Sequence, residues 1–236
     1  MASSHVASHY PGDVSGWWEW AVGPNRPPDT NRFFVVCVNN FGSCFGSTGP
    51  LTVKPLTGNP FAVEFPFPSI ADIVFFQREL QQALDIPQWH TVIGGSLGGM
   101  AALEWAARFP DKVGNVVCLN AGAKLSHIGR GLMDAQADMI KMGGTAGLKI
   151  ARRLATLSYV GEGYFRQLEK GDPAWQMPDW LSSEAEEFAM RFDQFSYLGF
   201  LSAMQTFDCS PVCLSERLRV IVVGCAEDIL FPPDPL

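Results

Sequence analysis

The sequence lacks any apolar run close to the ~20 residues that a membrane-spanning helix needs, which argues against an integral membrane protein. Its first residues, Met1 to His5, lack the charged and apolar regions of a secretory signal peptide. None of its 6 cysteines forms a Cys-x-x-Cys pair, and we expect reduced thiols that serve mostly as small core residues. These absences predict a soluble, cytoplasmic protein with no metal site.

Basic residues are in the minority. The 17 lysines and arginines face 24 aspartates and glutamates, a net charge of −7, which argues against nucleic acid as a general partner. A few arginines can still form a local site for an anionic substrate. With 236 residues and 47% hydrophobic content, the chain can form one large α/β domain or a domain with an insertion.

The most informative segment is residues 91–100, where a β-rich run leads into Gly-x-Ser-x-Gly around Ser96 and then into a helix-forming run at 101–108. In this context the motif indicates a nucleophile elbow, a tight strand-to-helix turn that exposes the serine hydroxyl. We expect Gly94 and Gly98 to be required because a Cβ atom at either position would crowd the turn. The backbone N–H of Leu97, next to the nucleophile, is the expected oxyanion donor. The alternative is a glycine-rich turn with a buried serine.

Apolar runs and helix signals alternate along much of the chain. Ser69 is a candidate N-cap with Asp72 at the third helical position. Alternating strands and helices predict an α/β fold, an α/β-hydrolase-like doubly wound and mostly parallel sheet. The expected strands are residues 33–38, 91–94, 116–119 and 218–223, and the expected helices are residues 70–84 and 101–108.

The pattern changes between about residues 124 and 207, where no strand is evident. Gly143 with Gly144, and the stretch 172–178, are expected to interrupt the helices. We therefore predict a core in residues 1–123, an inserted helical lid in 124–207, and a return strand in 208–236. The expected lid helices are residues 132–142, 147–157, 183–190 and 197–207.

A catalytic triad on this fold runs in the order Ser, then Asp or Glu, then His. Asp228 follows the last predicted strand, so its carboxylate is expected at the carboxyl edge of the sheet, near the elbow. Glu227, one residue earlier, is the competing candidate, and a solvated loop acid is the other interpretation.

No histidine follows Asp228, although the triad order requires one. The four histidines of the chain are His5, His9, His90 and His127, and we interpret all of them as structural or surface residues. A serine without a general base loses most of its nucleophilicity.

Several blocks beyond the elbow point to one family. They include the tryptophan-rich residues 16–20, the run 39–50, residues 99–106, 147–152 with Tyr159, 191–198, and 228–233. Together they closely resemble the homoserine O-acetyltransferase family, including its members that use succinyl-CoA. The resemblance covers nearly the whole chain.

The resemblance implies transfer of an acetyl group from acetyl-CoA to L-homoserine through an acyl-serine intermediate, an early step in methionine biosynthesis. It makes Ser96 the nucleophile, Asp228 the triad acid and Arg152 the anchor for the homoserine carboxylate, with Tyr159 beside it. Acyl-CoA is then a co-substrate, and no cofactor is expected. We expect a homodimer that has neither nucleic acid nor a membrane as a partner. Succinyl-CoA as the donor, and ester hydrolysis on the same fold, stay open. Without the resemblance, Arg152 beside Arg153 is equally well a solvated charge.

The chain departs from the family at both ends and in the lid. The family's N-terminal turn, which contributes to the oxyanion hole, and its C-terminal Gly-His-Asp, which supplies the triad histidine, have no counterpart here. Ala155 and Thr156 stand where the family usually has Gly-His. We expect a partial sequence of a normal enzyme that is nearly inactive by itself; a non-catalytic protein is the competing hypothesis.

Overall fold

The computed structural model describes residues 4–8, 10, 12–210 and 215–233. Its sheet has three parallel strands in the order β1 (Trp89–Gly95), β2 (Val113–Leu119) and β3 (Arg219–Val223). In the register Gly95 is opposite Leu119, and Leu119 is opposite Val223. All three strands therefore end at the same edge, where loops from distant parts of the chain meet.

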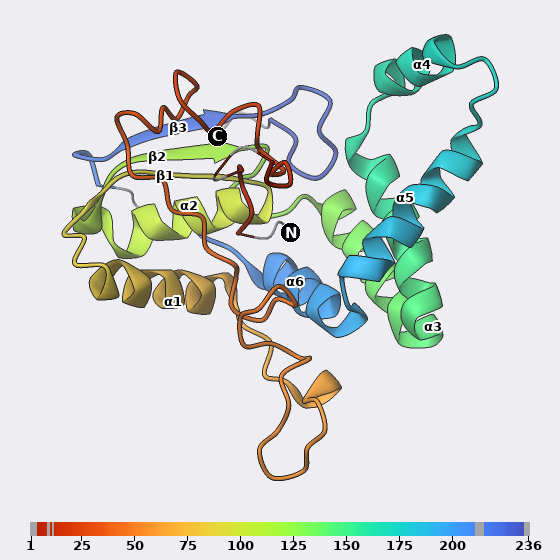
Figure 1. The fold of residues 1–236 in the computed structure, drawn as a ribbon, viewed down its shortest axis with the longest axis horizontal. Coiled ribbons are helices and arrows are strands. Elements are labelled where there is room, and N and C mark those ends of the chain that lie inside the picture. The colour runs from red at the N-terminus through yellow and green to blue at the C-terminus, as the bar shows by residue number, and fades with distance from the viewer. Residues whose placement is uncertain (1–3, 9, 11, 211–214, 234–236) are drawn as a thin grey trace.

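Helix α2 (Leu97–Arg108) lies against one face of the sheet, and α1 (Ile70–Ala83) packs against α2 (Figure 1). The capping box predicted for α1 is confirmed, because the Asp72 N–H donates to Ser69 Oγ at 3.2 Å and the Ser69 N–H donates to Asp72 Oδ2 at 2.8 Å. The α/β architecture expected from the sequence is confirmed.

The core lies between α2 and its neighbours. Met100 and Trp105 of α2 are almost completely buried, and the Trp105 indole N–H donates to Gln77 Oε1 of α1 at 2.8 Å. This bond joins the two helices and satisfies the polar atom of a buried ring. The helix that follows the elbow is therefore fixed on both sides, against the sheet and against α1.

The strand predicted at residues 33–38 is wrong. Residues 33–40 have no regular secondary structure, and 76% of Phe34 is exposed. The segment still lies beside the sheet, because the Phe33 ring is 4.9 Å from the His90 ring of β1. An apolar run shows that a segment tends to be buried, but a strand also needs a hydrogen-bonded neighbour, and this segment contacts β1 through side chains.

In the part of the chain that the structure describes, four helices follow β2: α3 (His127–Tyr159), α4 (Glu162–Gly171), α5 (Met177–Arg191) and α6 (Gln194–Thr206). Apart from Phe207, which follows α6, each of the four helical segments predicted between residues 124 and 207 lies in α3, α5 or α6; α4 was not predicted. Pro178, interpreted as part of a helix break, instead lies in the first turn of α5, where proline is tolerated. The role of this region as a lid stays a prediction.

Helix α3 is bent at Gly144, which has φ 57° and separates a first arm (127–143) from a second arm (145–159). The predicted break at Gly143 and Gly144 is thus confirmed. A Cβ atom on Gly147 would overlap the backbone of Met139 and Ile140, so the two arms pack closely at this glycine. Figure 1 shows the second arm running back towards the level of the sheet.

Short elements connect the main ones. The 3₁₀ helices η1 (Ala62–Glu64) and η2 (Pro110–Lys112) lie before α1 and before β2. Within the described ranges, no helix has the length and apolar character needed to cross a lipid bilayer.

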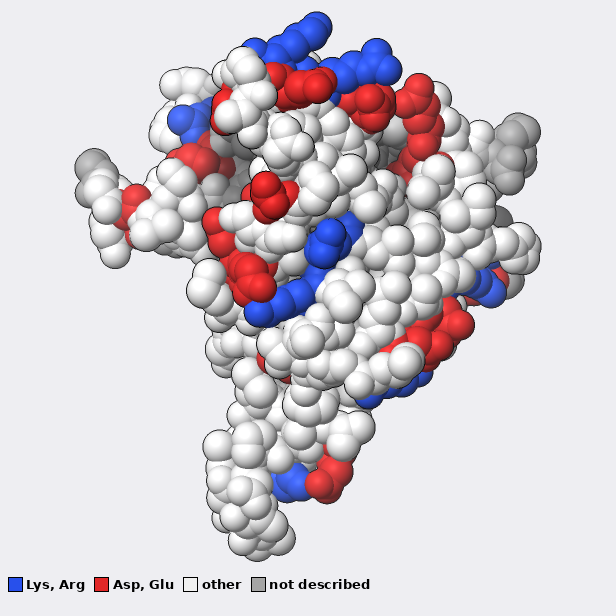
Figure 2. Space-filling view, turned by 90° about the vertical axis from the view of Figure 1, so that its right-hand side faces the viewer, with Lys and Arg blue, Asp and Glu red and all other residues white. Residues whose placement is uncertain are grey.

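The face formed by the helical region carries acidic and basic side chains close together (Figure 2). Ion pairs account for part of this pattern: Lys149 with Glu186 at 2.5 Å, Lys141 with Asp138 at 3.4 Å, and Arg166 with Glu162 at 3.2 Å. Such exposed pairs contribute little stability. They contrast with Arg152, described below, for which the described residues provide no such pair.

Candidate active site

Ser96 occupies a strained turn between β1 and α2. Its φ of 53° and ψ of −118° are rare for a residue with a side chain, and the residue is exposed. The backbone holds this conformation, because the Ser96 N–H donates to the Leu119 carbonyl at 2.9 Å and the Ser96 carbonyl accepts from the Met100 N–H at 3.0 Å. No hydrogen bond joins the Ser96 hydroxyl to another residue in the described part of the chain. Ser96 therefore has the geometry of a nucleophile elbow.

The two glycines around Ser96 have different roles. A Cβ atom on Gly94 would overlap the carbonyl group of Gly98, as the sequence predicted. A Cβ atom on Gly98 would meet nothing within 4 Å, so the expectation that it would crowd the turn is wrong. Gly99 is the second restricted position, because its Cβ would lie 2.6 Å from the Ala121 Cβ and 3.2 Å from the Cys118 sulfur.

Leu97 is the first residue of α2, so its N–H has no carbonyl acceptor within the helix. The free donors at a helix start, together with the helix dipole, favour negative charge. The Leu97 side chain is buried, with 3% exposure, which holds the backbone of this position in place. Leu97 remains the candidate oxyanion donor.

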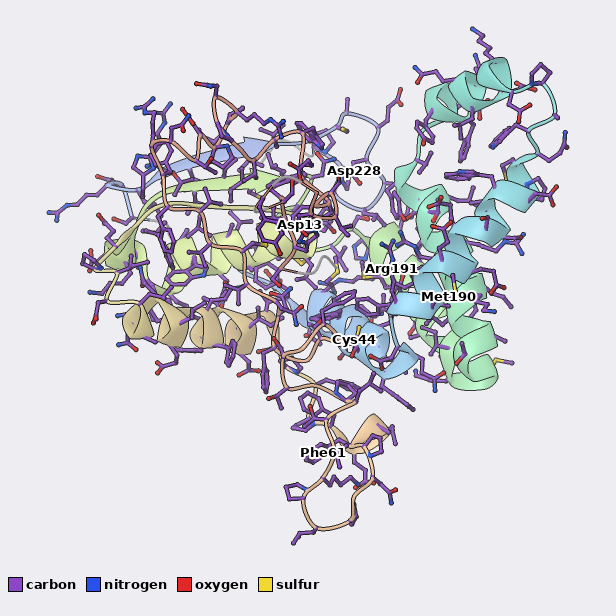
Figure 3. All side chains as sticks on the ribbon, viewed as in Figure 1. Asp13, Cys44, Phe61, Met190, Arg191 and Asp228 are labelled. Atoms are coloured by element: carbon purple, nitrogen blue, oxygen red, sulfur yellow. The ribbon has the colours of Figure 1, made fainter. Side chains whose placement is uncertain are left out.

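Asp228 lies in the loop after β3, between the carboxyl edge of the sheet and the helical region (Figure 3). Its Oδ1 accepts the N–H groups of Leu230 at 2.8 Å and Phe231 at 3.0 Å. Glu227 is exposed, whereas Asp228 is half-buried. A carboxylate held by two backbone donors has a fixed direction, which favours Asp228 over Glu227 as the triad acid.

The Asp228 loop is also tied to the start of α3. Ser126 donates its hydroxyl to the Ile229 carbonyl at 2.7 Å and its N–H to the Leu230 carbonyl at 3.1 Å. The same hydroxyl accepts the Gly129 N–H at 2.9 Å, so one serine caps the helix and anchors the loop. The candidate triad acid and the first arm of α3 are thereby positioned together.

Asn120 is a polar residue at this edge that the sequence did not single out. It directly follows Leu119, whose carbonyl accepts the Ser96 N–H, and it has a φ of 43°. Its N–H donates to the Val223 carbonyl at 2.7 Å, and its side-chain nitrogen lies 3.7 Å from the Cys225 sulfur. Its position could have been found only from the strand register.

The described histidines do not complete a triad. His90 is the second residue of β1, near the end of the strand opposite Ser96, and its Nδ1 is 2.8 Å from Thr91 Oγ1. His127 is exposed at the start of α3, and His5 lies 2.5 Å from the Val14 carbonyl. His9 lies outside the described residues. Neither His90 nor His127 is hydrogen-bonded to Ser96 or Asp228 in the described part of the chain.

Arg152 lies on the second arm of α3 among aromatic rings. Its guanidinium carbon is 4.4 Å from the Phe188 ring centroid and 5.5 Å from that of Tyr159. Thr156 Oγ1 is 3.2 Å from the Tyr159 hydroxyl, so Arg152, Thr156 and Tyr159 share one face of the helix, as the spacing predicted. The nearby Lys149 instead pairs with Glu186.

The Arg152 side chain has an unmet hydrogen-bonding requirement. Its Nε is buried, yet no acceptor for it is found in the described part of the chain. A buried donor without a partner is costly, and a carboxylate is the acceptor that best suits a guanidinium. Arg152 therefore has the surroundings of an anion anchor.

Comparison with known proteins places this chain among relatives of known name. Residues 10–141 match the model of the alpha/beta hydrolase fold. A homoserine O-succinyltransferase of Hydrogenovibrio crunogenus is 38% identical, over 98% of this chain and 69% of its own length. This chain belongs to the homoserine O-acyltransferase family.

Another relative and two solved structures are also similar to this chain. A serine O-succinyltransferase of Litchfieldella anticariensis is 34% identical to this chain, over 98% of this chain and 72% of the relative. The structure of homoserine O-acetyltransferase from Bacillus anthracis superposes with a TM-score of 0.84 at 24% identity, over 98% of this chain and 72% of that one. Esterase E22 superposes with a TM-score of 0.86 at 23% identity, over 98% of this chain and 74% of the esterase. These two likenesses support the fold.

Proposed function

We propose that this protein transfers an acyl group from an acyl-CoA thioester to the hydroxyl of L-homoserine. The observation that carries the proposal is the conformation of Ser96, an exposed serine held at positive φ between a parallel strand and a helix start. Family membership supplies the substrate class. Because the conformation is costly, its presence at this turn favours a catalytic role over a structural one.

The proposed reaction has two halves. The Ser96 hydroxyl attacks the thioester carbonyl, gives up its proton to a general base, and forms a tetrahedral oxyanion that faces the Leu97 N–H. Collapse of this intermediate breaks the carbon–sulfur bond, and CoA leaves as the thiol. The homoserine hydroxyl then attacks the acyl-serine ester and regenerates Ser96. Asp228 would orient the base, which in this family is a histidine.

The second half requires that a small zwitterion be oriented. Homoserine has one carboxylate and one ammonium group, and its hydroxyl must reach the acyl carbon. Bidentate pairing of that carboxylate with Arg152, beside Tyr159, supplies the orientation. The buried, unpaired Nε of Arg152 supports this role.

The donor and the acceptor each have two candidates. The sequence resemblance favours acetyl-CoA, whereas the names of the similar relatives favour succinyl-CoA, and one of those relatives is a serine acyltransferase. We propose homoserine as the acceptor and test both donors. We also propose that the protein works in the cytoplasm as a homodimer without a bound cofactor. Sedimentation of the purified protein measures the oligomeric state.

The test follows the acyl group by mass spectrometry. Protein expressed from its complete reading frame is mixed briefly with acetyl-CoA or succinyl-CoA, and the acylated peptide is sequenced. We expect the label on Ser96, its loss on addition of homoserine, and appearance of O-acylhomoserine. Ser96→Ala is the matched control and should not be labelled.

Three outcomes contradict parts of this proposal. Label on Cys44 or Cys225 with none on Ser96 would eliminate the nucleophile. Loss of label at the same rate with and without homoserine would indicate a hydrolase. Transfer to serine with none to homoserine would change the acceptor while leaving the acyl-serine chemistry intact.

A further inference from the structure

Arg152 rests on an aromatic cluster, which we define as Phe188, Phe192 and Tyr197. Phe188 and Phe192 are stacked, with ring centroids 5.1 Å apart and planes at 13°. Arg152 lies over the Phe188 ring, and Tyr197 meets Phe188 edge-on at 5.6 Å and 84°. The guanidinium thus lies on one member of a buried, rigid set of rings.

No carboxylate among the residues that the structure describes fixes the direction of Arg152. No ion pair joins it to an acid in the described ranges, and its Nε has no acceptor there. Its described neighbours are the Phe188 and Tyr159 rings and the Tyr197 phenol. Stacking on a ring fixes the plane of a guanidinium but lets it slide across the ring. The groups that hold the rings therefore also set the direction in which the guanidinium N–H groups point.

Tyr197 is the polar member of the cluster and is tied to another helix. Its hydroxyl donates to Gln136 Oε1 at 2.8 Å, across 61 residues of sequence. Gln136 is itself buried, with 4% exposure, and its Nε2 donates to the Leu132 carbonyl at 3.2 Å. The direction of the Gln136 amide is therefore fixed, and its oxygen faces Tyr197.

The Tyr197–Gln136 bond joins two helical segments and lies near a third, which carries Arg152. Gln136 lies on the first arm of α3, Tyr197 on α6, and Arg152 on the second arm of α3, beyond the bend at Gly144. Burial raises the pKa of Tyr197 to about 12, while the positive charge of Arg152 acts in the opposite direction. The phenol therefore stays protonated and can donate to Gln136, and it lies within electrostatic reach of Arg152.

We infer that Tyr197, held by Gln136, is a positioning residue that fixes the Arg152 guanidinium for the carboxylate of the amino-acid acceptor. This inference rests on the proposed function. The simpler alternative is that Tyr197 only fills the core, with 1% exposure. The two differ in what removal of the hydroxyl alone would change.

The kinetic test compares Tyr197→Phe with Tyr164→Phe, which removes the same atom from a half-exposed tyrosine of α4. We expect Tyr197→Phe to raise the KM for homoserine about 3- to 10-fold, the effect of one buried hydrogen bond. The rate of Ser96 acylation should stay within about twofold, because acylation does not use Arg152. An unchanged KM, or equal losses in both half-reactions, would overturn the inference.

A double-mutant cycle tests whether Tyr197 acts through Arg152. In an Arg152→Lys background the guanidinium is already absent, so Tyr197→Phe should raise the KM for homoserine by less than about twofold further. A full, independent effect in that background would overturn the inference. If Tyr197→Phe does not fold, Gln136→Met removes the same hydrogen bond at similar volume and should give the same kinetic pattern.

A chemical readout separates this inference from the proposed function. Phenylglyoxal modifies accessible arginines, and the modified peptides are counted without any turnover. We expect Tyr197→Phe to speed modification of Arg152 at least about threefold and to leave exposed Arg166 unchanged. If homoserine is not the acceptor but Tyr197→Phe still speeds the modification of Arg152, the proposed function is wrong and the positioning role of Tyr197 is retained. If labelling does not respond, the positioning fails whatever the substrate.

Discussion

Gly94 and Gly98 meet across the turn that presents Ser96, because a Cβ atom on Gly94 would overlap the Gly98 carbonyl while a Cβ on Gly98 would meet nothing. The contact is one-sided: the first glycine is required by the backbone of the second. The strained serine between them is therefore held by close approach of strand and helix backbone.

Gly94→Ala should be far more damaging than Gly98→Ala. We expect Gly94→Ala to lower the free energy of unfolding by about 3 kcal/mol, since a backbone atom must move to admit the methyl group. Gly98→Ala should change it by less than about 1 kcal/mol, with a small gain from helix propensity. Urea unfolding followed by circular dichroism measures both. Similar stabilities for the two variants would contradict the packing described for the elbow.

Ser96→Gly should be more stable than Ser96→Ala. Glycine adopts positive φ without steric cost, whereas alanine retains the strain of the wild-type turn. The expected difference is about 1 kcal/mol in the free energy of unfolding. Both variants should lose acyl-enzyme formation on the order of 10³-fold or more. Equal stability of the two would mean that Ser96 is not strained in solution.

Asp228→Asn should lower turnover on the order of 10³-fold, because the amide oxygen keeps the bonds from Leu230 and Phe231 but the charge that orients the base is lost. The matched control is Glu227→Gln, which should alter turnover by less than about twofold. Steady-state assays with homoserine and the better donor provide the comparison. A larger loss from the Glu227 change would transfer the acid role to that residue.

Arg152→Lys should raise the KM for homoserine about 10- to 100-fold, since lysine keeps the charge but cannot form two parallel hydrogen bonds. Acylation of Ser96 should be nearly unaffected. Arg153→Lys, the adjacent position, is the control and should be neutral. If Arg152→Lys slowed acylation and left the homoserine dependence unchanged, Arg152 would be a CoA contact or a structural residue.

Stability should fall between about pH 10 and 12 in a way that depends on Tyr197. Burial raises the pKa of its phenol from 10.0 to about 12, with Arg152 opposing the rise and Tyr159 adding to it. In that window the unfolded chain loses the proton and the folded one keeps it, so the free energy of unfolding decreases as pH rises, by about 3 kcal/mol in total. The contribution is complete below pH 10. Tyr197→Phe should flatten this part of the unfolding profile, and an unchanged profile would contradict the burial of the phenol.

Local sequence determined the elbow, the capping box of α1 and the bend of α3. Each depends on residues a few positions apart: Gly94 with Ser96, Ser69 with Asp72, and Gly144 alone. Backbone conformations at short range follow from steric limits and local hydrogen bonds, which a sequence states directly. The acyltransferase family was likewise readable from blocks of sequence.

Tertiary structure decided what those residues meet. The apolar run at 33–38 gave no sign that it would lack a hydrogen-bonded neighbour, because pairing depends on strands elsewhere in the chain. The preference for Asp228 over Glu227 as the candidate acid rests on two backbone donors of a folded loop. The contact of Tyr197 with Gln136 spans 61 residues and needs α3 and α6 already packed. Such contacts depend on how whole helices and strands fit together, and no local pattern encodes that fit.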